Sequence, residues 1–207
     1  MAATTKPSTL VVYLSGKPTT PSGYDDILTK LASEGQVHTA ESKEAALDIL
    51  SNPTQATTRI LVLDGALANE ENLDLARRLV DFAWGGATVI LGGSFSSAEP
   101  SRMMELLDRT WGLPWAYEGK RREETRLNGD AVTVAVAERG GLLEKYTQEA
   151  VFVRNVERDA GWYETEDGGA AATVLMPFGE GKVGYVGDVN GEEGTVRSVL
   201  AMFGVAA

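Results

Sequence analysis

The 207-residue sequence contains no cysteine and a single histidine, His38. The absence of cysteine excludes disulfide bonds, thiolate nucleophiles and sulfur-ligated metal sites. Mechanisms that depend on a cysteine nucleophile, or on two imidazole groups, are therefore excluded for this chain.

Positive charge is also scarce, because 19 Lys and Arg residues stand against 30 Asp and Glu residues, which gives a net charge of -11. A strongly negative chain repels nucleic acids and anionic membranes. The one basic cluster, at residues 120–122, is followed directly by two glutamates, which indicates a solvated face. We therefore expect neither a nucleic-acid nor a membrane partner.

Long apolar runs are missing as well. No run approaches the roughly 18 residues that cross a bilayer, and the start MAATTKPSTL lacks the basic and apolar segments of a secretory signal. The remaining composition, 43% hydrophobic and 24% charged, is that of a globular protein. We expect a cytoplasmic protein that forms a single domain over residues 1–207.

Apolar patterning indicates alternating strands and helices. Nearly continuous apolar runs at 9–15, 59–64, 87–91 and 182–188 predict central parallel strands. Between and after them, apolar residues at helical spacing predict helices that begin near Ser42, Asn69 and Pro100 and a last one at 195–203. The predicted fold class is α/β, a three-layer flavodoxin-like parallel sheet.

Residues 113–170 interrupt this pattern. They mix charge, glycine and scattered aromatic residues, with strand-like pieces at 131–136 and 150–156. We predict that this segment is an insertion at the edge of the sheet, after which the parallel pattern returns with a strand at 171–176.

Two stretches carry a resemblance to a known family. VILGGSFSS, at 89–97, follows an apolar strand, and GEGKVGYVGDVNGEEGTVRSVLAMFG, at 179–204, has the pattern of a last strand, loop and helix. Together with the order of elements, they resemble the class I glutamine amidotransferase-like superfamily, which includes ThuA-like and DJ-1-like proteins. The resemblance covers most of the chain and implies a strand-to-helix nucleophile elbow at VILGGSFSS.

The residues that define amidotransferase chemistry differ. The family elbow has the form G-x-C-x-G, and here GGSFS places Ser94 where the cysteine stands. The family's His-x-Glu after the last core strand is replaced by Asp188-Val189-Asn190. The resemblance therefore implies that glutamine hydrolysis by the family mechanism is lost.

Ser94 and Asp188 remain the candidate catalytic residues. A serine hydroxyl is a weak nucleophile until a positioned base removes its proton, and the unperturbed carboxyl pKa of about 4 makes Asp188 a poor base. His38 precedes Ser94, whereas α/β-hydrolases place the histidine last. The simpler interpretation of Ser94 is a hydroxyl that caps a tight turn or contacts a ligand.

The carboxyl ends of parallel strands converge on the crevice where open α/β sheets bind ligands. We therefore predict a ligand-binding set at that edge, which comprises Ser15, Asp64, Gly93, Ser94, Asp188 and Glu192. No nucleotide motif is present, and two glutamates before a helix are ordinary first-turn residues. We predict neither a cofactor nor a metal site.

The functional hypothesis is a non-amidotransferase member that binds a small ligand or a protein partner. The alternative is a hydrolase that uses Ser94 with Asp188 or His38 as helper. The sequence identifies neither the small molecule nor the protein partner, and it leaves a homodimer open.

Overall fold

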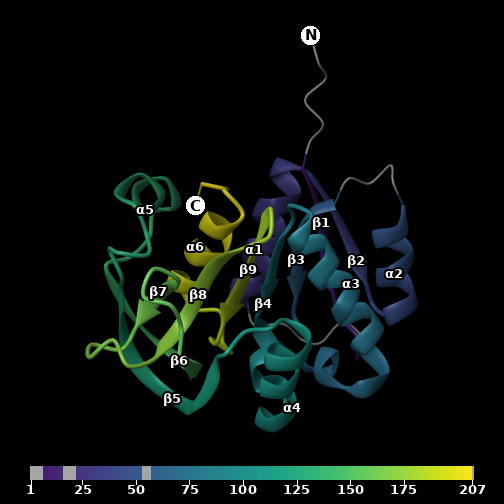
Figure 1. The fold of residues 1–207 in the computed structure, drawn as a ribbon. Coiled ribbons are helices and arrows are strands. Elements are labelled where there is room, and N and C mark those ends of the chain that lie inside the picture. Colours follow the sequence, from purple (N-terminus) through teal and green to yellow (C-terminus); the bar gives the residue numbers. More distant parts are fainter. Residues whose placement is uncertain (1–6, 16–21, 53–56, 207) are drawn as a thin grey trace.

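The computed structural model describes residues 7–15, 22–52 and 57–206, which form one mixed sheet with helices around it (Figure 1). The strands are β1 (Ser8–Val12), β2 (Gln36–Ala40), β3 (Thr57–Val62), β4 (Thr88–Leu91), β5 (Ala116–Leu127), β6 (Lys145–Arg154), β7 (Gly161–Glu164), β8 (Ala171–Phe178) and β9 (Gly181–Val186). The α-helices are α1 (Ser22–Glu34), α2 (Lys43–Ser51), α3 (Leu73–Trp84), α4 (Pro100–Glu105), α5 (Val134–Gly140) and α6 (Glu193–Met202). Shorter turns are the 3₁₀ segments η1 (Gly65–Ala68), η2 (Glu70–Asn72) and η3 (Gly93–Ser97), and the π-helical turn η4 (Leu106–Thr110).

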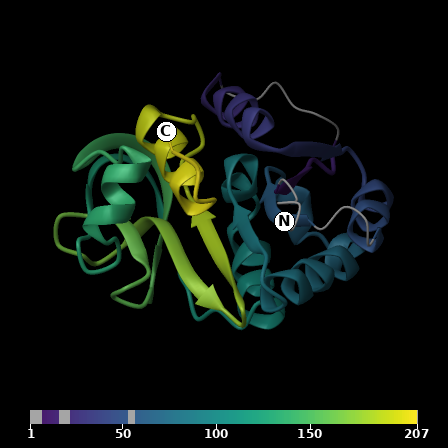
Figure 2. The ribbon, with the colours of Figure 1, turned by 90° about the horizontal axis from the view of Figure 1, so that it is seen from above.

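Strands β2, β1, β3, β4 and β9 lie side by side in that order and run parallel. Their side chains alternate between two buried clusters. Val12 and Val62 pack with α2, α3 and α4, whereas Val11 and Leu61 pack with α1 and α6. Figure 2 shows these helix groups on opposite faces of the sheet. Because both faces are covered, the inner strands β1, β3 and β4 are largely apolar, as the runs in the sequence predicted, whereas the edge strand β2 is partly exposed.

The second half of the sheet is antiparallel, and it contradicts the predicted fold class. β8 pairs antiparallel with β9, and β8, β6, β5 and β7 close into a barrel through the β7–β8 pairing. Across the described strands, antiparallel pairings outnumber parallel ones. The prediction of a three-layer flavodoxin-like parallel sheet with an edge insertion is therefore wrong.

The physical reason lies in the connection between β8 and β9. Only Gly179 and Glu180 separate the two strands, and Gly179 has a φ of +59°. Two-residue loops of this kind join antiparallel strands, whereas a parallel pair needs a crossover of a dozen residues or more. The predicted parallel strand at 171–176 thus runs in the opposite direction.

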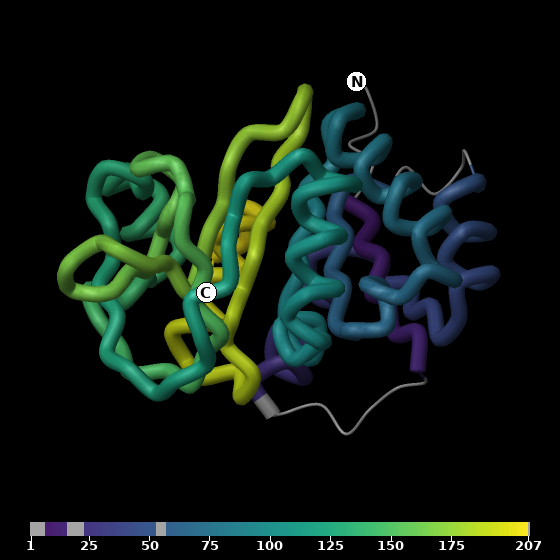
Figure 3. Tube along the Cα trace, turned by 60° about the horizontal axis from the view of Figure 1, so that its bottom comes forward, coloured from purple at the N-terminus to yellow at the C-terminus, as the bar shows by residue number. Residues whose placement is uncertain are grey.

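Residues 113–170 build most of the barrel rather than an edge insertion, and Figure 3 shows their green trace on the left, separated from the purple and blue N-terminal part by the yellow β8 and β9 segments. The strand-like piece predicted at 150–156 lies largely in β6. The piece predicted at 131–136 instead contains a turn at 131–133 and the first residues of α5. Thr133 caps this helix by accepting a hydrogen bond from the Val136 amide, and Gly141 ends it with left-handed dihedrals. These helix-capping signals outweighed the strand preference of the β-branched residues in this segment.

The predicted helix starts are borne out at two of three positions. Ser42 caps α2 by accepting a hydrogen bond from the Ala45 amide, and Pro100 opens α4. Asn69 precedes η2 instead, and α3 begins only at Leu73. No helix of the described chain is long and apolar enough to cross a membrane.

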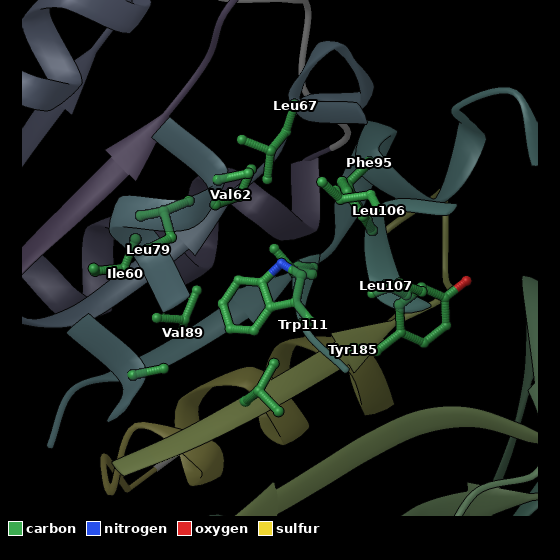
Figure 4. Packing of buried hydrophobic residues seen from close by; sticks show 14 of the residues in the cluster. Ile60, Val62, Leu67, Leu79, Val89, Phe95, Leu106, Leu107, Trp111 and Tyr185 are labelled. Atoms are coloured by element: carbon green, nitrogen blue, oxygen red, sulfur yellow. The ribbon is translucent and has the colours of Figure 1, made fainter. Parts of the chain in front are cut away.

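The core anchors the turn that follows β4. Phe95 is fully buried and belongs to the same apolar cluster as Leu107 and Trp111 (Figure 4). Burial of a phenylalanine side chain contributes about 1.5–3 kcal/mol. Packing of Phe95 in the apolar core therefore holds the VILGGSFSS segment in place.

Candidate functional site

The site is built at the carboxyl ends of the parallel strands, where η3 follows β4. Gly93 begins the turn with a φ of +58°, and a Cβ atom there would lie 3.0 Å from Leu63 Cδ2. Glycine meets both demands, because it adopts positive φ readily and has no side chain. The turn leaves the side chain of the next residue, Ser94, exposed.

Ser94 makes a structural hydrogen bond. Its Oγ donates to the Leu63 carbonyl oxygen at 2.5 Å. Ser96 behaves in a similar way, with Oγ donating to the Gly93 carbonyl oxygen at 2.8 Å. The Ser96 hydroxyl thus caps its own turn, whereas the Ser94 hydroxyl bonds to the residue that follows β3, 31 positions earlier in the chain.

His38 is distant from this turn. It lies on β2, and β1 and β3 separate that strand from β4. Within the described chain, no hydrogen bond joins His38 to Ser94, and His38 Nε2 is buried without a partner. The histidine is therefore not placed to activate the serine.

Asp64 organises the loops after β1 and β3. Its Oδ2 accepts hydrogen bonds from the amides of Leu14 (2.7 Å) and Ser15 (2.6 Å). Its Oδ1 accepts one from the Ala66 amide at 2.8 Å and one from Ser15 Oγ at 3.3 Å. Both carboxylate oxygens are thus occupied by the protein itself. Asp64 positions this edge of the sheet, with Ser15 beside it.

Asp188 organises the loop between β9 and α6. The residue is fully buried, and its backbone forms an antiparallel bridge with Ala150 of β6. Oδ1 accepts the Asn190 amide at 2.8 Å, and Oδ2 accepts the Glu192 amide at 2.9 Å. Glu192 is the residue that precedes α6. The carboxyl group therefore shapes the start of the last helix.

The pKa values of Asp188 and Glu192 are shifted in opposite directions. Burial, and then a side-chain hydrogen bond with Glu192, raise the pKa of Asp188 to about 7. Burial acts to raise the pKa of Glu192 too, but hydrogen bonds from Asp188 and from backbone amides outweigh it and lower that pKa. Arg122 Nη1 lies 3.6 Å from Glu192 Oε1 and also favours the charged form of Glu192. Asp188 is thus the protonated partner over most of the range below neutral pH.

Tyr24 joins the two parts of the site, and sequence reasoning missed it. Its hydroxyl accepts a hydrogen bond from the Gly93 amide at 2.8 Å and donates one to the Asp188 carbonyl oxygen at 3.1 Å. The phenol belongs to a residue of α1, which is far from either loop in the sequence. No local pattern signals such a contact.

The predicted ligand set is thus gathered at one edge of the sheet, but it does not form one pocket. Hydrogen bonds join Ser15 to Asp64 and the Glu192 amide to Asp188. Within the described chain, no hydrogen bond joins Ser94 to Asp188. The pocket at this edge, with a volume of about 280 Å³, contains Ser15 alone of the predicted set. Its lining is Ser15, Gly65, Ala66, Ala68, Asn69, Ala98, Glu99 and Arg102.

Three polar side chains of this pocket were not predicted as site residues from the sequence: Asn69, Glu99 and Arg102. Arg102 Nη1 donates to Asn69 Oδ1 at 3.0 Å, so the two residues span the pocket. Glu99 accepts hydrogen bonds from the amides that open α4. Among the described residues, no group of three or more His, Cys, Asp or Glu side chains is placed to hold a metal ion.

Comparisons with known proteins identify the fold. No family model and no curated protein matches the sequence. A ThuA-like protein from Bacteroides uniformis matches with a TM-score of 0.60 at 9% identity, over 98% of this chain and 91% of that one. A cytoplasmic protein from Salmonella typhimurium matches with a TM-score of 0.58 at 12% identity, over 95% of both chains.

Larger enzymes contain a similar unit. A β-galactosidase from Bacillus circulans matches with a TM-score of 0.55 at 14% identity, over 98% of this chain. The chain spans 32% of the length of that enzyme and 33% of an exo-β-1,4-mannosidase from an Opitutaceae bacterium. Identities this low bear on the fold alone. The chain has a fold similar to that of ThuA-like proteins.

Proposed function

We propose that the protein is a non-amidotransferase of the glutamine amidotransferase-like type that binds a small ligand at the carboxyl ends of its parallel strands. The observation that carries this proposal is that Ser94 and Asp188, which stand at the positions of the family's catalytic cysteine and histidine, are already hydrogen-bonded within the protein. Ser94 Oγ donates to the Leu63 carbonyl, and the Asp188 carboxyl accepts hydrogen bonds from its own loop.

These hydrogen bonds argue against nucleophilic chemistry. A catalytic serine needs a base within about 3 Å that accepts its proton, and the partner of Ser94 is a carbonyl oxygen instead. The Asp188 carboxyl is fully buried and turned toward Asn190 and Glu192. Neither residue is arranged to pass a proton to the other.

The pocket at the sheet edge supports a binding role. Its volume of about 280 Å³ is slightly below the roughly 300–1,000 Å³ that is typical of small-molecule sites. Ser15, Asn69 and Arg102 offer hydrogen-bond donors around it. Asp64 holds the Ser15 loop in place, so the pocket is preformed on its β1 side.

A hydrolase that uses Ser94 is the second candidate. Two observations favour it: the exposed Ser94 side chain on a strand-to-helix turn, and the raised pKa of about 7 of Asp188, which burial causes first. A group with a pKa near 7 suits general base catalysis. This candidate requires Ser94 to exchange the Leu63 carbonyl for a different hydrogen-bond partner.

Activity measurements on Ser94→Ala separate the two candidates. We expect no glutaminase activity and only background ester hydrolysis in the wild-type protein, and the same background in the variant. Ser97→Ala is the matched control, because Ser97 is an exposed serine of the same turn and the substitution also removes one hydroxyl group. Ester hydrolysis well above background that Ser94→Ala abolishes and Ser97→Ala retains would establish the hydrolase.

A further inference from the structure

A second pocket lies beside the first, between two helical segments. It has a volume of about 300 Å³ and opens between the start of α3 and the α4–η4 segment, which follow each other along one face of the sheet (Figure 1). Its lining is Ala68, Glu70, Leu73, Arg77, Arg102, Glu105, Leu106, Arg109 and Thr110. Arg77 of α3, Arg102 of α4 and Arg109 of η4 therefore line the same pocket.

Helical spacing explains this convergence. Arg102, Glu105 and Arg109 lie three to four residues apart and share one side of the α4–η4 segment. Arg77 faces them from α3, which packs against η4. The last turn is π-helical, with the Trp111 amide bonded to the Leu106 carbonyl at 3.3 Å. Single π-helical turns inside helices are rare and are frequent at functional sites.

The three guanidinium groups differ in the hydrogen bonds and ion pairs that they form. Arg102 is bonded to Asn69 at 3.0 Å, and Arg109 pairs with Glu105 at 2.7 Å. Arg77 has no ion pair or hydrogen bond to the described part of the chain. Both members of the Arg109–Glu105 pair are exposed, and such pairs contribute only about 0–1 kcal/mol. Arg77 is therefore available to a ligand, and Arg109 is held only weakly.

The charge of the pocket opposes that of the whole protein. Three arginines stand against Glu70 and Glu105 in its lining, whereas the chain carries a net charge of -11. An arginine fork binds carboxylate and phosphate oxygens in two parallel hydrogen bonds. Ala68, Leu73 and Leu106 provide an apolar wall next to these donors.

We propose that this pocket binds a small organic anion, with a phosphate or carboxylate group held by Arg77 and Arg109 and an apolar part on Leu73 and Leu106. The inference rests on the proposed binding function and deepens it, because the two pockets share Ala68 and Arg102. Arg102 stands where they meet, so one ligand reaches from the arginines to the Ser15 edge.

Titration calorimetry with phenyl phosphate and with benzoate tests the proposal. We expect at least one of the two to bind, with an affinity at least tenfold lower in Arg77→Gln. Arg78→Gln is the matched control, because Arg78 neighbours Arg77 on α3, pairs with Asp81 and lies outside the pocket. It should bind like the wild-type protein. Preference for one probe tells a phosphate ligand from a carboxylate ligand.

Two results would overturn the proposal: no binding of either anion, or equal weakening by Arg77→Gln and Arg78→Gln. Arg109→Gln provides a second test, because it removes a pocket arginine from a different element, and unchanged binding in both pocket variants would also count against the site. A covalent adduct on Ser94 would instead overturn the proposed function, whether or not the anions bind. The two failures are therefore distinguishable.

Discussion

At the scale of single residues, Tyr24 is the contact on which the candidate site depends most. Its hydroxyl satisfies the Gly93 amide at the β4 turn and the Asp188 carbonyl in the last loop, and the side chain is almost fully buried. Removal of this hydroxyl leaves a buried donor and a buried acceptor without partners, which costs about 1–3 kcal/mol.

We therefore expect Tyr24→Phe to lower the free energy of unfolding by about that amount, 1–3 kcal/mol. Urea unfolding measures the change. Tyr117→Phe is the control, because Tyr117 is exposed and makes no hydrogen bond within the described chain. It should differ little from the wild-type protein. Equal stability of all three proteins would show that the link through Tyr24 contributes nothing.

Asp188 makes stability depend on pH. Burial, followed by the hydrogen bond with Glu192, raises its pKa to about 7, compared with about 4 in an unfolded chain. Between these values the folded protein holds more protons than the unfolded one, so this group's contribution to stability falls as pH rises. Below about pH 4 the contribution is complete, and above about pH 7 it is lost.

Asp188→Asn should remove this slope. We expect the stability of the wild-type protein, relative to that of the variant, to decline between pH 4.5 and 7.5, as measured by urea unfolding across about that range. Glu166→Gln, on the exposed β7–β8 turn, should keep the wild-type profile. A difference between wild type and Asp188→Asn that does not vary with pH would contradict the raised pKa.

Single residues also show how far the sequence predicts the site. Asp64, Ser94 and Asp188 follow apolar strands, so their place at the carboxyl edge could be predicted. Tyr24 could not, because its phenol reaches the site from α1. Arg102 could not either, because its role depends on how α4 packs beside η1.

At the scale of elements, apolar patterning predicts the strands but not their direction. The runs at 59–64 and 87–91 are continuous because both faces of β3 and β4 are buried. The run at 171–176 has the same pattern, yet β8 is antiparallel to β9. Direction is set by the connection, and the two residues between β8 and β9 leave no room for a crossover. The two-residue loop at 179–180 was therefore the feature of the sequence that indicated an antiparallel pair.

Gly187 follows β9 directly and bonds to two further positions of the barrel. Its amide donates to the Ala172 carbonyl, and its carbonyl accepts the Val151 amide, so it bridges β8 and β6. A Cβ atom at this position would lie 2.0 Å from the Val151 carbonyl oxygen. No side-chain movement relieves a clash with backbone.

We expect Gly187→Ala to destabilise the protein by about 1–3 kcal/mol, the usual cost of overpacking. Thermal or urea unfolding measures it. Gly129→Ala is the matched control, since nothing lies within 4 Å of a Cβ atom there, and its effect should stay within about 0.5 kcal/mol. Similar stabilities for the two variants would contradict the close strand approach at Gly187.

At the scale of the whole molecule, β9 belongs to both halves of the sheet. It pairs with β4 of the parallel half and with β8 of the barrel. One apolar cluster also contains residues of both halves, among them Val62 and Val153. We therefore predict that the described chain unfolds as one unit, as the expectation of a single domain implies.

Two probes test this cooperativity. Trp162 lies in the barrel and Trp111 in the core of the parallel half, and both are buried. With the other tryptophans replaced, urea transitions from the two fluorescence signals and from circular dichroism should coincide. An earlier transition at Trp162 alone would show that the barrel unfolds independently.

The central claim for the molecule is that Ser94 supports the structure of a binding site and performs no covalent chemistry. A fluorophosphonate probe tests it most directly, because a serine with an activated hydroxyl becomes covalently labelled. Intact-mass spectrometry of the treated protein should show no added mass, since Ser94 donates to the Leu63 carbonyl and has no base beside it. A single phosphonyl adduct mapped to Ser94, and lost in Asp188→Asn or His38→Ala, would contradict the account.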